Sequence, residues 1–241
     1  MPVILHIETS TRVCSVGVSV QGELVAYKED NSQNYSHSSV LTPFIEDTLR
    51  QAAIPIRKLS TVAISMGPGS YTGLRIGVST AKGICYALDI PLIAIDTLHA
   101  MASHGVELLK QDDHHRPLLH EHTIFCPMID ARRMEVYYNL FDHQMNALRR
   151  TEARIIDQDT FNDLEQNKTL ILMGDGSQKC QEVIGRSNIH VMPWILPSVK
   201  GMVGLAQKKY DQKDFVDVAY FEPFYLKDFV AGKPKVKGLY R

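Results

Sequence analysis

The chain has 241 residues, 44% of them apolar and 22% charged, which is ordinary for a soluble globular protein that needs no disulfide or metal to stabilise its core. A net charge of −1 argues against a nucleic-acid binder that relies on overall charge, and leaves only a local basic patch open. The four cysteines form no CxxC pair, and no apolar run approaches the roughly 20 residues that span a bilayer. We therefore expect a cytoplasmic protein with reduced thiols and no membrane contact.

The sequence pattern of residues 1–109 predicts that they form one lobe. A run of β-branched residues opens it, Gln21-Gly22 marks a tight turn, and apolar residues at helical spacing follow before Pro55. The predicted strands are 3–7, 13–20, 23–28, 59–66 and 91–95, and the predicted helices are 38–53, 72–88 and 97–109. The resulting order is βββαβαβα.

The polar, histidine-rich stretch 110–122 predicts a linker, after which residues 123–230 predict a second lobe with a similar order. Residues 231–241 are expected to form a mobile basic tail. In the second lobe the predicted strands are 123–129, 135–141, 147–156, 169–173 and 189–192, and the predicted helices are 160–165, 177–184 and 197–210. We expect helix 197–210 to pack back on the first lobe.

Each lobe begins with a strand that ends on a carboxylate just before a hairpin, Glu8 in the first and Asp130 in the second. A duplicated βββαβα unit of this kind resembles the actin, Hsp70 and sugar-kinase (ASKHA) plan, an α/β fold with nucleotide between two lobes. There the carboxylate serves as a metal ligand or general base. Glu8 departs from the Asp usual at this position, and capping of the hairpin turn is the simpler interpretation of both residues.

A glycine-rich loop joins a predicted strand to a predicted helix. Its residues Gly67, Gly69, Ser70, Thr72 and Gly73 could gather backbone N–H groups around a phosphate at the helix N-terminus. The spacing matches neither the Walker A loop, nor GxGxxG, nor GxSxG. A tight turn that serves only packing is the alternative.

Small residues at Gly73, Gly77 and Ala81 follow at intervals of four, so they share one helix face and allow another backbone to come close. This stripe indicates either packing within the chain or a helix-pair interface with another subunit. The helix before it carries Leu41 and Ile45 at core-like spacing.

Three further clusters have two interpretations each. The arginine pair Arg132 and Arg133 can bind phosphate or carboxylate, or form salt bridges with Asp130 or Glu135. The linker histidines His114, His115, His120 and His122 have no regular ligand spacing, so a solvated loop is favoured over a metal site. The basic residues near the C-terminus can solubilise the chain or meet RNA phosphates, and they are Lys227, Lys233, Lys235, Lys237 and Arg241.

Four segments together resemble the bacterial TsaB (YeaZ) family of the tRNA threonylcarbamoyladenosine machinery, over residues 3 to about 230. They are Ile7-Glu8-Thr9-Ser10, Gly67-Pro68-Gly69-Ser70-Tyr71-Thr72-Gly73-Leu74-Arg75-Ile76-Gly77, Asp130-Ala131-Arg132-Arg133-x-Glu135-Val136-Tyr137 and Glu222-Pro223-x-Tyr225-Leu226.

The resemblance implies a non-catalytic paralogue of TsaD. TsaD transfers threonylcarbamoyl from threonylcarbamoyl-adenylate to N6 of the adenosine 3′ of the tRNA anticodon, and it carries an HxxxH metal pair. That pair falls on Thr97 and Met101 here, so no catalytic or metal residue is expected.

The implied partners are a TsaD-like subunit docked on the two long first-lobe helices, a TsaE-like ATPase, tRNA through the complex, and a second copy when the chain is alone. The resemblance implies no intrinsic cofactor, while ATP or ADP can bind at the interface with the partner. Two alternatives stay open at this point, a small-molecule phosphotransferase of the ASKHA type and a glycoprotease-like peptidase.

Overall fold

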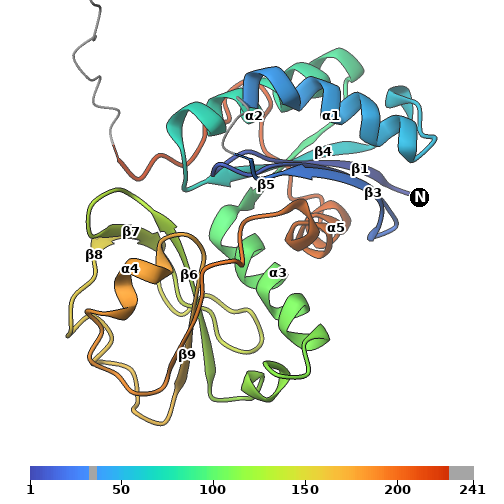
Figure 1. The fold of residues 1–241 in the computed structure, drawn as a ribbon. Coiled ribbons are helices and arrows are strands. Elements are labelled where there is room, and N and C mark those ends of the chain that lie inside the picture. The colour runs from blue at the N-terminus through green and yellow to red at the C-terminus, as the bar shows by residue number, and fades with distance from the viewer. Residues whose placement is uncertain (33–36, 228–241) are drawn as a thin grey trace, which may run out of the picture.

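The computed structural model describes residues 1–32 and 37–227, which form two lobes, each with its own five-stranded sheet (Figure 1). The strands of the first sheet are β1 (Val3–Glu8), β2 (Cys14–Val20), β3 (Glu23–Asp30), β4 (Thr61–Gly67) and β5 (Leu92–Asp96). Their spatial order is β3-β2-β1-β4-β5, with β1 antiparallel to β2 and parallel to β4. The tip of β1 therefore lies beside the tip of β4, where the glycine-rich loop starts.

The second sheet repeats this plan. Its strands are β6 (Thr123–Asp130), β7 (Glu135–Tyr138), β8 (Glu152–Ile155), β9 (Thr169–Met173) and β10 (Ile189–Met192). Their order, β8-β7-β6-β9-β10, matches the first sheet strand for strand, and β6 is again antiparallel to the next strand and parallel to the fourth. This repeat confirms the predicted duplicated, two-lobed ASKHA-type fold.

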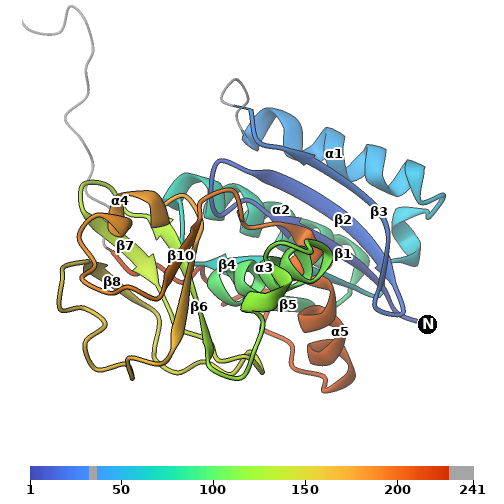
Figure 2. The same ribbon diagram turned by 60° about the horizontal axis from the view of Figure 1, so that its bottom comes forward.

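Helices cover both faces of the first sheet. The helical segments are α1 (His37–Gln51), η1 (Ile56–Lys58), α2 (Tyr71–Leu88), α3 (Thr97–Gln111), η2 (Arg116–Leu118), α4 (Ser177–Gln181), η3 (Val199–Gly201) and α5 (Val203–Asp211). Figures 1 and 2 show α1 and α2 on one face of this sheet and α3 with α5 on the other. One apolar face of α1 and of α2 is buried against β1, β2 and β4.

Local sequence explains where α2 and α3 begin and end. The Ser70 side chain accepts a hydrogen bond from Gly73 N and caps α2, and Asp96 caps α3 through His99 N in the same way. At the other end of α2, Asp89 adopts a left-handed conformation with φ +53°, which ends the helix. Ser70 lies just beyond β4 and Asp96 is the last residue of β5, and because these two strands are parallel, both helices start at the same edge of the sheet.

Helix α3 is shared by the two lobes. Ala100 packs with Val199 and Met202 in the core of the first lobe, whereas Leu98 and Met101 belong to the core of the second lobe around Phe125. A single rigid element therefore ties both cores together.

One predicted helix, 177–184, is shorter in the structure, where α4 ends at Gln181, and two others are not formed as predicted. Residues 160–165 form turns, because the Asp157 carboxylate takes the Thr160 hydroxyl and so competes with helical backbone bonding. Helix 197–210 is divided into η3 and α5 where Gly201 lies against α3, since a Cβ at Gly201 would be 1.9 Å from the Ala100 carbonyl oxygen. Helix α5 lies against β5 and β1 of the first sheet.

No helix within residues 1–32 and 37–227 is both long and apolar enough to cross a membrane. The expected mobile tail, 231–241, and its lysines fall outside the described residues.

Candidate functional site

The glycine-rich loop between β4 and α2 is filled by its own chain. A Cβ at Gly69 would lie 2.2 Å from the Ser10 carbonyl oxygen, and one at Gly73 would lie 2.1 Å from the Thr9 carbonyl oxygen. Gly67 has φ +115°, and a Cβ there would lie 2.7 Å from the Phe224 carbonyl oxygen. These glycines bring the backbone of α2 against the end of β1.

The polar groups of the loop are used in the same packing. Ser70 N donates to the Ser10 carbonyl at 2.6 Å, Gly67 N donates to Thr97 Oγ1 at 3.2 Å, and Gly73 N donates to Ser70 Oγ at 3.3 Å. A phosphate cradle needs such N–H groups to converge on a ligand. Among the residues predicted to form a phosphate loop (Gly67, Gly69, Ser70, Thr72 and Gly73), three thus use their N–H groups within the chain, which favours the packing alternative.

The second lobe contains an equivalent glycine-containing loop, which the sequence interpretation missed. Met66–Ser70 and Met173–Ser177 both read Met-Gly-x-Gly-Ser, and each follows the fourth strand of its sheet. Gly174 also has a positive φ, +97°, and a Cβ there would be 2.3 Å from the Met128 carbonyl oxygen. In both lobes this loop closes over the end of the first strand, and the repeated pentapeptide was the signal that could have revealed it.

Glu8 lies at the tip of β1, fully buried. Its Oε1 accepts hydrogen bonds from Ser10 N at 2.6 Å and from Ser65 Oγ at 3.0 Å, whereas Oε2 has no partner within the part of the chain that the structure describes. Burial raises the pKa of this carboxyl, and the hydrogen bonds from Ser10 and Ser65 only partly oppose that shift. Glu8 is thus poorly suited to hold a cation, and it ties β1 to β4 instead.

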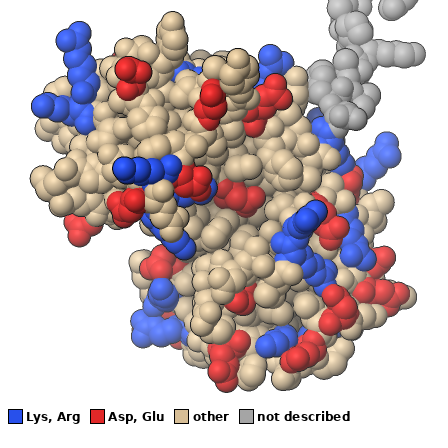
Figure 3. Space-filling view, turned by 180° about the vertical axis from the view of Figure 1, so that it is seen from behind, with Lys and Arg blue, Asp and Glu red and all other residues tan. Residues whose placement is uncertain are grey.

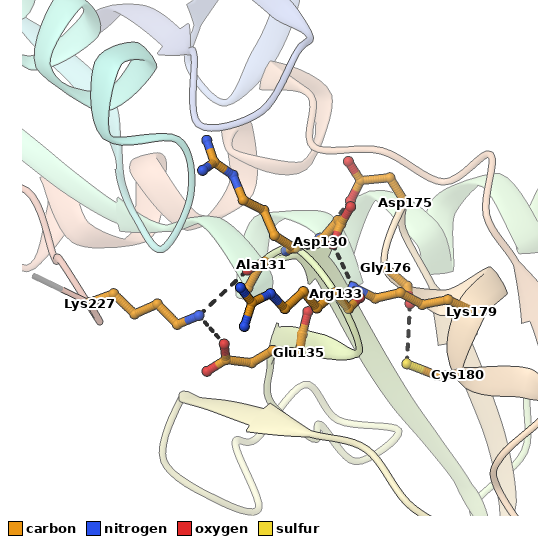
Figure 4. Close-up of polar contacts among 10 residues, drawn as sticks. Asp130, Ala131, Arg133, Glu135, Asp175, Gly176, Lys179, Cys180 and Lys227 are labelled. Atoms are coloured by element: carbon orange, nitrogen blue, oxygen red, sulfur yellow. Dashed lines mark hydrogen bonds and ion pairs between the residues drawn. The ribbon is translucent and has the colours of Figure 1, made fainter. Parts of the chain in front are cut away.

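Asp130, the corresponding residue of β6, is exposed and part of a charged cluster (Figure 4). Its Oδ1 accepts from Arg132 N at 2.8 Å and from Lys179 Nζ at 2.5 Å, and Asp175 Oδ1 accepts from Asp130 N at 3.0 Å. Partial burial favours a higher pKa for Asp130, but Lys179 and the Arg132 amide outweigh it and the pKa is lowered. Asp130 caps the hairpin turn, while Asp175 and Lys179 are neighbours that sequence reasoning did not identify.

Thr97 and Met101, the two positions where the resemblance to TsaD would put metal-binding histidines, are both buried. Thr97 Oγ1 accepts from Gly67 N, and the Met101 side chain is so close to Gly174 that a Cβ there would be 2.9 Å from Met101 Cε. Neither a hydroxyl engaged in this way nor a packed thioether is a ligand for a hard catalytic ion. The residues present do not fit the metal.

The predicted interface stripe faces inward. A Cβ at Gly77 would be 2.2 Å from Thr9 Oγ1, and Ala81 is fully buried against the first sheet. Leu41 and Ile45 are buried in the same core. The expectation that these residues and Gly73 form a surface for another subunit is therefore wrong, since their partners lie within the chain.

The histidine-rich linker holds no group of three or more metal-ligand side chains, and neither does any other part of the described chain. Its clearest polar contact joins His115 Nδ1 to Asp112 Oδ2 at 2.6 Å.

Close to this linker, a groove of about 840 Å³ lies between the C-terminal half of α3, helix α5 and loops of the second lobe. The polar residues that line it include Lys110, His143 and Lys200. Basic and acidic residues are interspersed on the rear face of the molecule (Figure 3).

The comparison with known proteins agrees with this architecture. A family model described as TsaD, tRNA N6-adenosine threonylcarbamoyltransferase, matches residues 30–234. The chain belongs to this family. The tRNA threonylcarbamoyladenosine biosynthesis protein TsaB of Haemophilus influenzae is 28% identical over 95% of both chains. TsaB of Escherichia coli is 27% identical over 95% of this chain and 96% of its own.

Among solved structures, YeaZ from Pseudomonas aeruginosa shares the fold of this TsaD-family chain, with a TM-score of 0.78 and 21% identity over 94% of this chain and all of that one. The TsaB (YeaZ) resemblance predicted from the four motifs is confirmed by these relatives.

Proposed function

We propose that this chain is a non-catalytic subunit of the complex that transfers threonylcarbamoyl to N6 of the adenosine 3′ of the tRNA anticodon. Its place in tRNA threonylcarbamoyladenosine biosynthesis follows from its family and from relatives named TsaB. Its task in that complex is to dock and activate a TsaD-like catalytic subunit, in the cytoplasm.

The observation that carries this proposal is the pair Thr97 and Met101. The resemblance to TsaD puts the two metal-binding histidines at these positions, and here both side chains are buried, Thr97 against Gly67 and Met101 against Gly174. A phosphotransferase role has less support for a similar reason, since the carbonyls of Ser10 and Thr9 pack directly against Gly69 and Gly73 of the glycine loop. Activity then has to come from a partner.

The outward face of α2 supports docking. Tyr86 is 86% exposed, and a Cβ at Gly83 would meet nothing within 4 Å. Together with Lys82, Val218 and neighbouring residues they bound a shallow, mainly apolar groove of about 540 Å³. An exposed aromatic side chain beside an apolar groove is typical of the centre of a protein interface.

Three further elements of the proposal come from the family resemblance. A TsaE-like ATPase joins the pair, and any ATP or ADP binds where this chain meets its partner rather than in its own glycine loop. In the absence of the catalytic subunit, a second copy of the chain occupies the same outward face of α1 and α2.

The docking step is tested by Tyr86→Glu, with Ile155→Glu on edge strand β8 as the control. Both replace an exposed apolar side chain by a carboxylate, since Ile155 is 64% exposed on the second lobe. We expect Tyr86→Glu to weaken binding to the TsaD-like subunit about 10-fold or more, as for an interface anchor, and Ile155→Glu to leave it unchanged. Equal binding by wild type and Tyr86→Glu in calorimetry would refute docking at this face.

A further inference from the structure

The turn between β6 and β7 has an unusual backbone for its sequence. Arg132 and Arg133 have φ values of +73° and +52°, in the left-handed region that glycine, asparagine and aspartate prefer. Both arginines are exposed, so no burial of their side chains compensates for this conformation. Strained non-glycine residues that persist on a surface are concentrated at binding sites.

Lys179 of α4 binds the backbone of this turn. Lys179 Nζ donates to Asp130 Oδ1 at 2.5 Å, to the Arg133 carbonyl at 2.7 Å and to the Glu135 carbonyl at 2.8 Å. Asp130 adds a bond from Arg132 N at 2.8 Å. These four hydrogen bonds hold the backbone of the turn, from which both arginine side chains extend as exposed residues.

The nearby acidic groups are already paired with lysines. Asp130 forms its ion pair with Lys179 and Glu135 forms one with Lys227, as Figure 4 shows. Within residues 1–32 and 37–227, neither Arg132 nor Arg133 forms a side-chain hydrogen bond or ion pair. The salt-bridge alternative raised by the sequence thus does not apply, and two guanidinium groups stay available for a ligand.

The first lobe contributes another cationic side chain close to the β6–β7 turn. Arg12, in the turn between β1 and β2, is exposed and close enough to Asp175 to lower the pKa of that carboxyl, although burial raises it overall. Asp175 in turn accepts from Asp130 N. Arg12 therefore lies near Asp175 from the first-lobe side, so both lobes contribute positive charge close to the arginine turn.

We propose that Arg132 and Arg133 form an anion-binding turn that contacts backbone phosphates of the tRNA acted on by the complex. Guanidinium groups match phosphate oxygens in bidentate geometry and keep their charge at every physiological pH. With a net charge of only −1 on the whole chain, attraction for RNA has to come from such a local cluster. The inference rests on the proposed function, because tRNA reaches this chain within the complex.

The test uses the full complex with the double variant Arg132→Gly/Arg133→Gly. Glycine suits the left-handed backbone, so the variant keeps the turn and removes only the guanidinium groups. Arg57→Ala/Lys58→Ala, an adjacent exposed basic pair on η1 of the first lobe, removes the same charge elsewhere. We measure KM and kcat for tRNA modification, and the salt dependence of tRNA binding by fluorescence anisotropy.

We expect the glycine variant to bind tRNA about 10-fold more weakly, to raise KM with kcat unchanged, and to lower the salt slope by about 1.5–2, as for two lost phosphate contacts. The η1 variant should behave as the wild type. An unchanged affinity and salt slope for the glycine variant overturn the inference, as does a loss of co-purification with the TsaD-like subunit at unchanged tRNA affinity. The proposed function fails separately, if omission of the whole chain leaves tRNA modification intact.

Discussion

Helix α2 carries two glycines whose replacement by alanine should have opposite effects on stability. At Gly77 the new Cβ would be 2.2 Å from Thr9 Oγ1 and 3.0 Å from Ile64 Cδ1, so at least one neighbour has to move. Thr9 Oγ1 donates to the Gly73 carbonyl at 2.9 Å, and a shift of Thr9 breaks this bond. Overpacking costs about 1–3 kcal/mol and the lost hydrogen bond about 1 kcal/mol, against a gain of about 0.5–1 kcal/mol in helix propensity.

The net expectation for Gly77→Ala is a loss of about 1.5–3 kcal/mol, or about 4–10 °C in Tm for a chain of this size. Gly83→Ala makes the same chemical change where nothing lies within 4 Å, and it should stabilise the chain by about 0.5–1 kcal/mol. Thermal and urea unfolding of the isolated chain measure both. If Gly77→Ala is as stable as Gly83→Ala, the stripe does not pack inside the chain and our correction of the interface prediction is wrong.

Three other substitutions test the packing and charge of the site. Glu8→Gln removes a carboxyl group whose pKa is raised in the folded chain. Such a group contributes its full stabilisation below its unfolded pKa near 4.5, and this stabilisation is lost as the pH rises through the folded pKa. The stability of the variant relative to wild type should thus increase with pH by up to about 1.4 kcal/mol per unit, and a difference independent of pH would contradict a raised pKa for the buried Glu8. Met101→Ala should reduce the free energy of unfolding by about 2–5 kcal/mol in urea, because Met101 is fully buried in the second-lobe core. A near-neutral effect would show that α3 is loosely packed against that core. Lys179→Met leaves three oxygen atoms of the β6–β7 turn without their ammonium donor. We therefore expect faster hydrogen exchange at the Glu135 amide. Unchanged exchange would mean that Lys179 does not hold the turn.

Much of the fold could be predicted from the sequence because strand and helix periodicity dominate it. Strands β9 and β10 have the predicted bounds, and the duplicated order was visible from the strand-tip residues Glu8 and Asp130. Local side-chain chemistry was harder to foresee. The Asp157–Thr160 contact replaces a predicted helix with turns, and Gly201 interrupts another where it meets α3.

The site was predictable in part for a specific reason. Spacing identified a small-residue face on α2, but it could not tell whether Gly77 meets Thr9 of the same chain or a helix of another subunit. Likewise, a glycine-rich loop after a strand is compatible with a phosphate or with the Ser10 carbonyl. Which group approaches such a glycine is decided by the tertiary structure, and the repeated Met-Gly-x-Gly-Ser pentapeptide, which the sequence interpretation missed, was the available sign of packing.

The most direct test of the central claim is reconstitution of tRNA modification from purified components, with the modified adenosine quantified by mass spectrometry. We predict no product from this chain alone with threonylcarbamoyl-adenylate and tRNA, little from the TsaD-like and TsaE-like subunits, and full activity when all three are combined. Product formed by this chain alone, or full activity without it, would contradict a non-catalytic activating subunit.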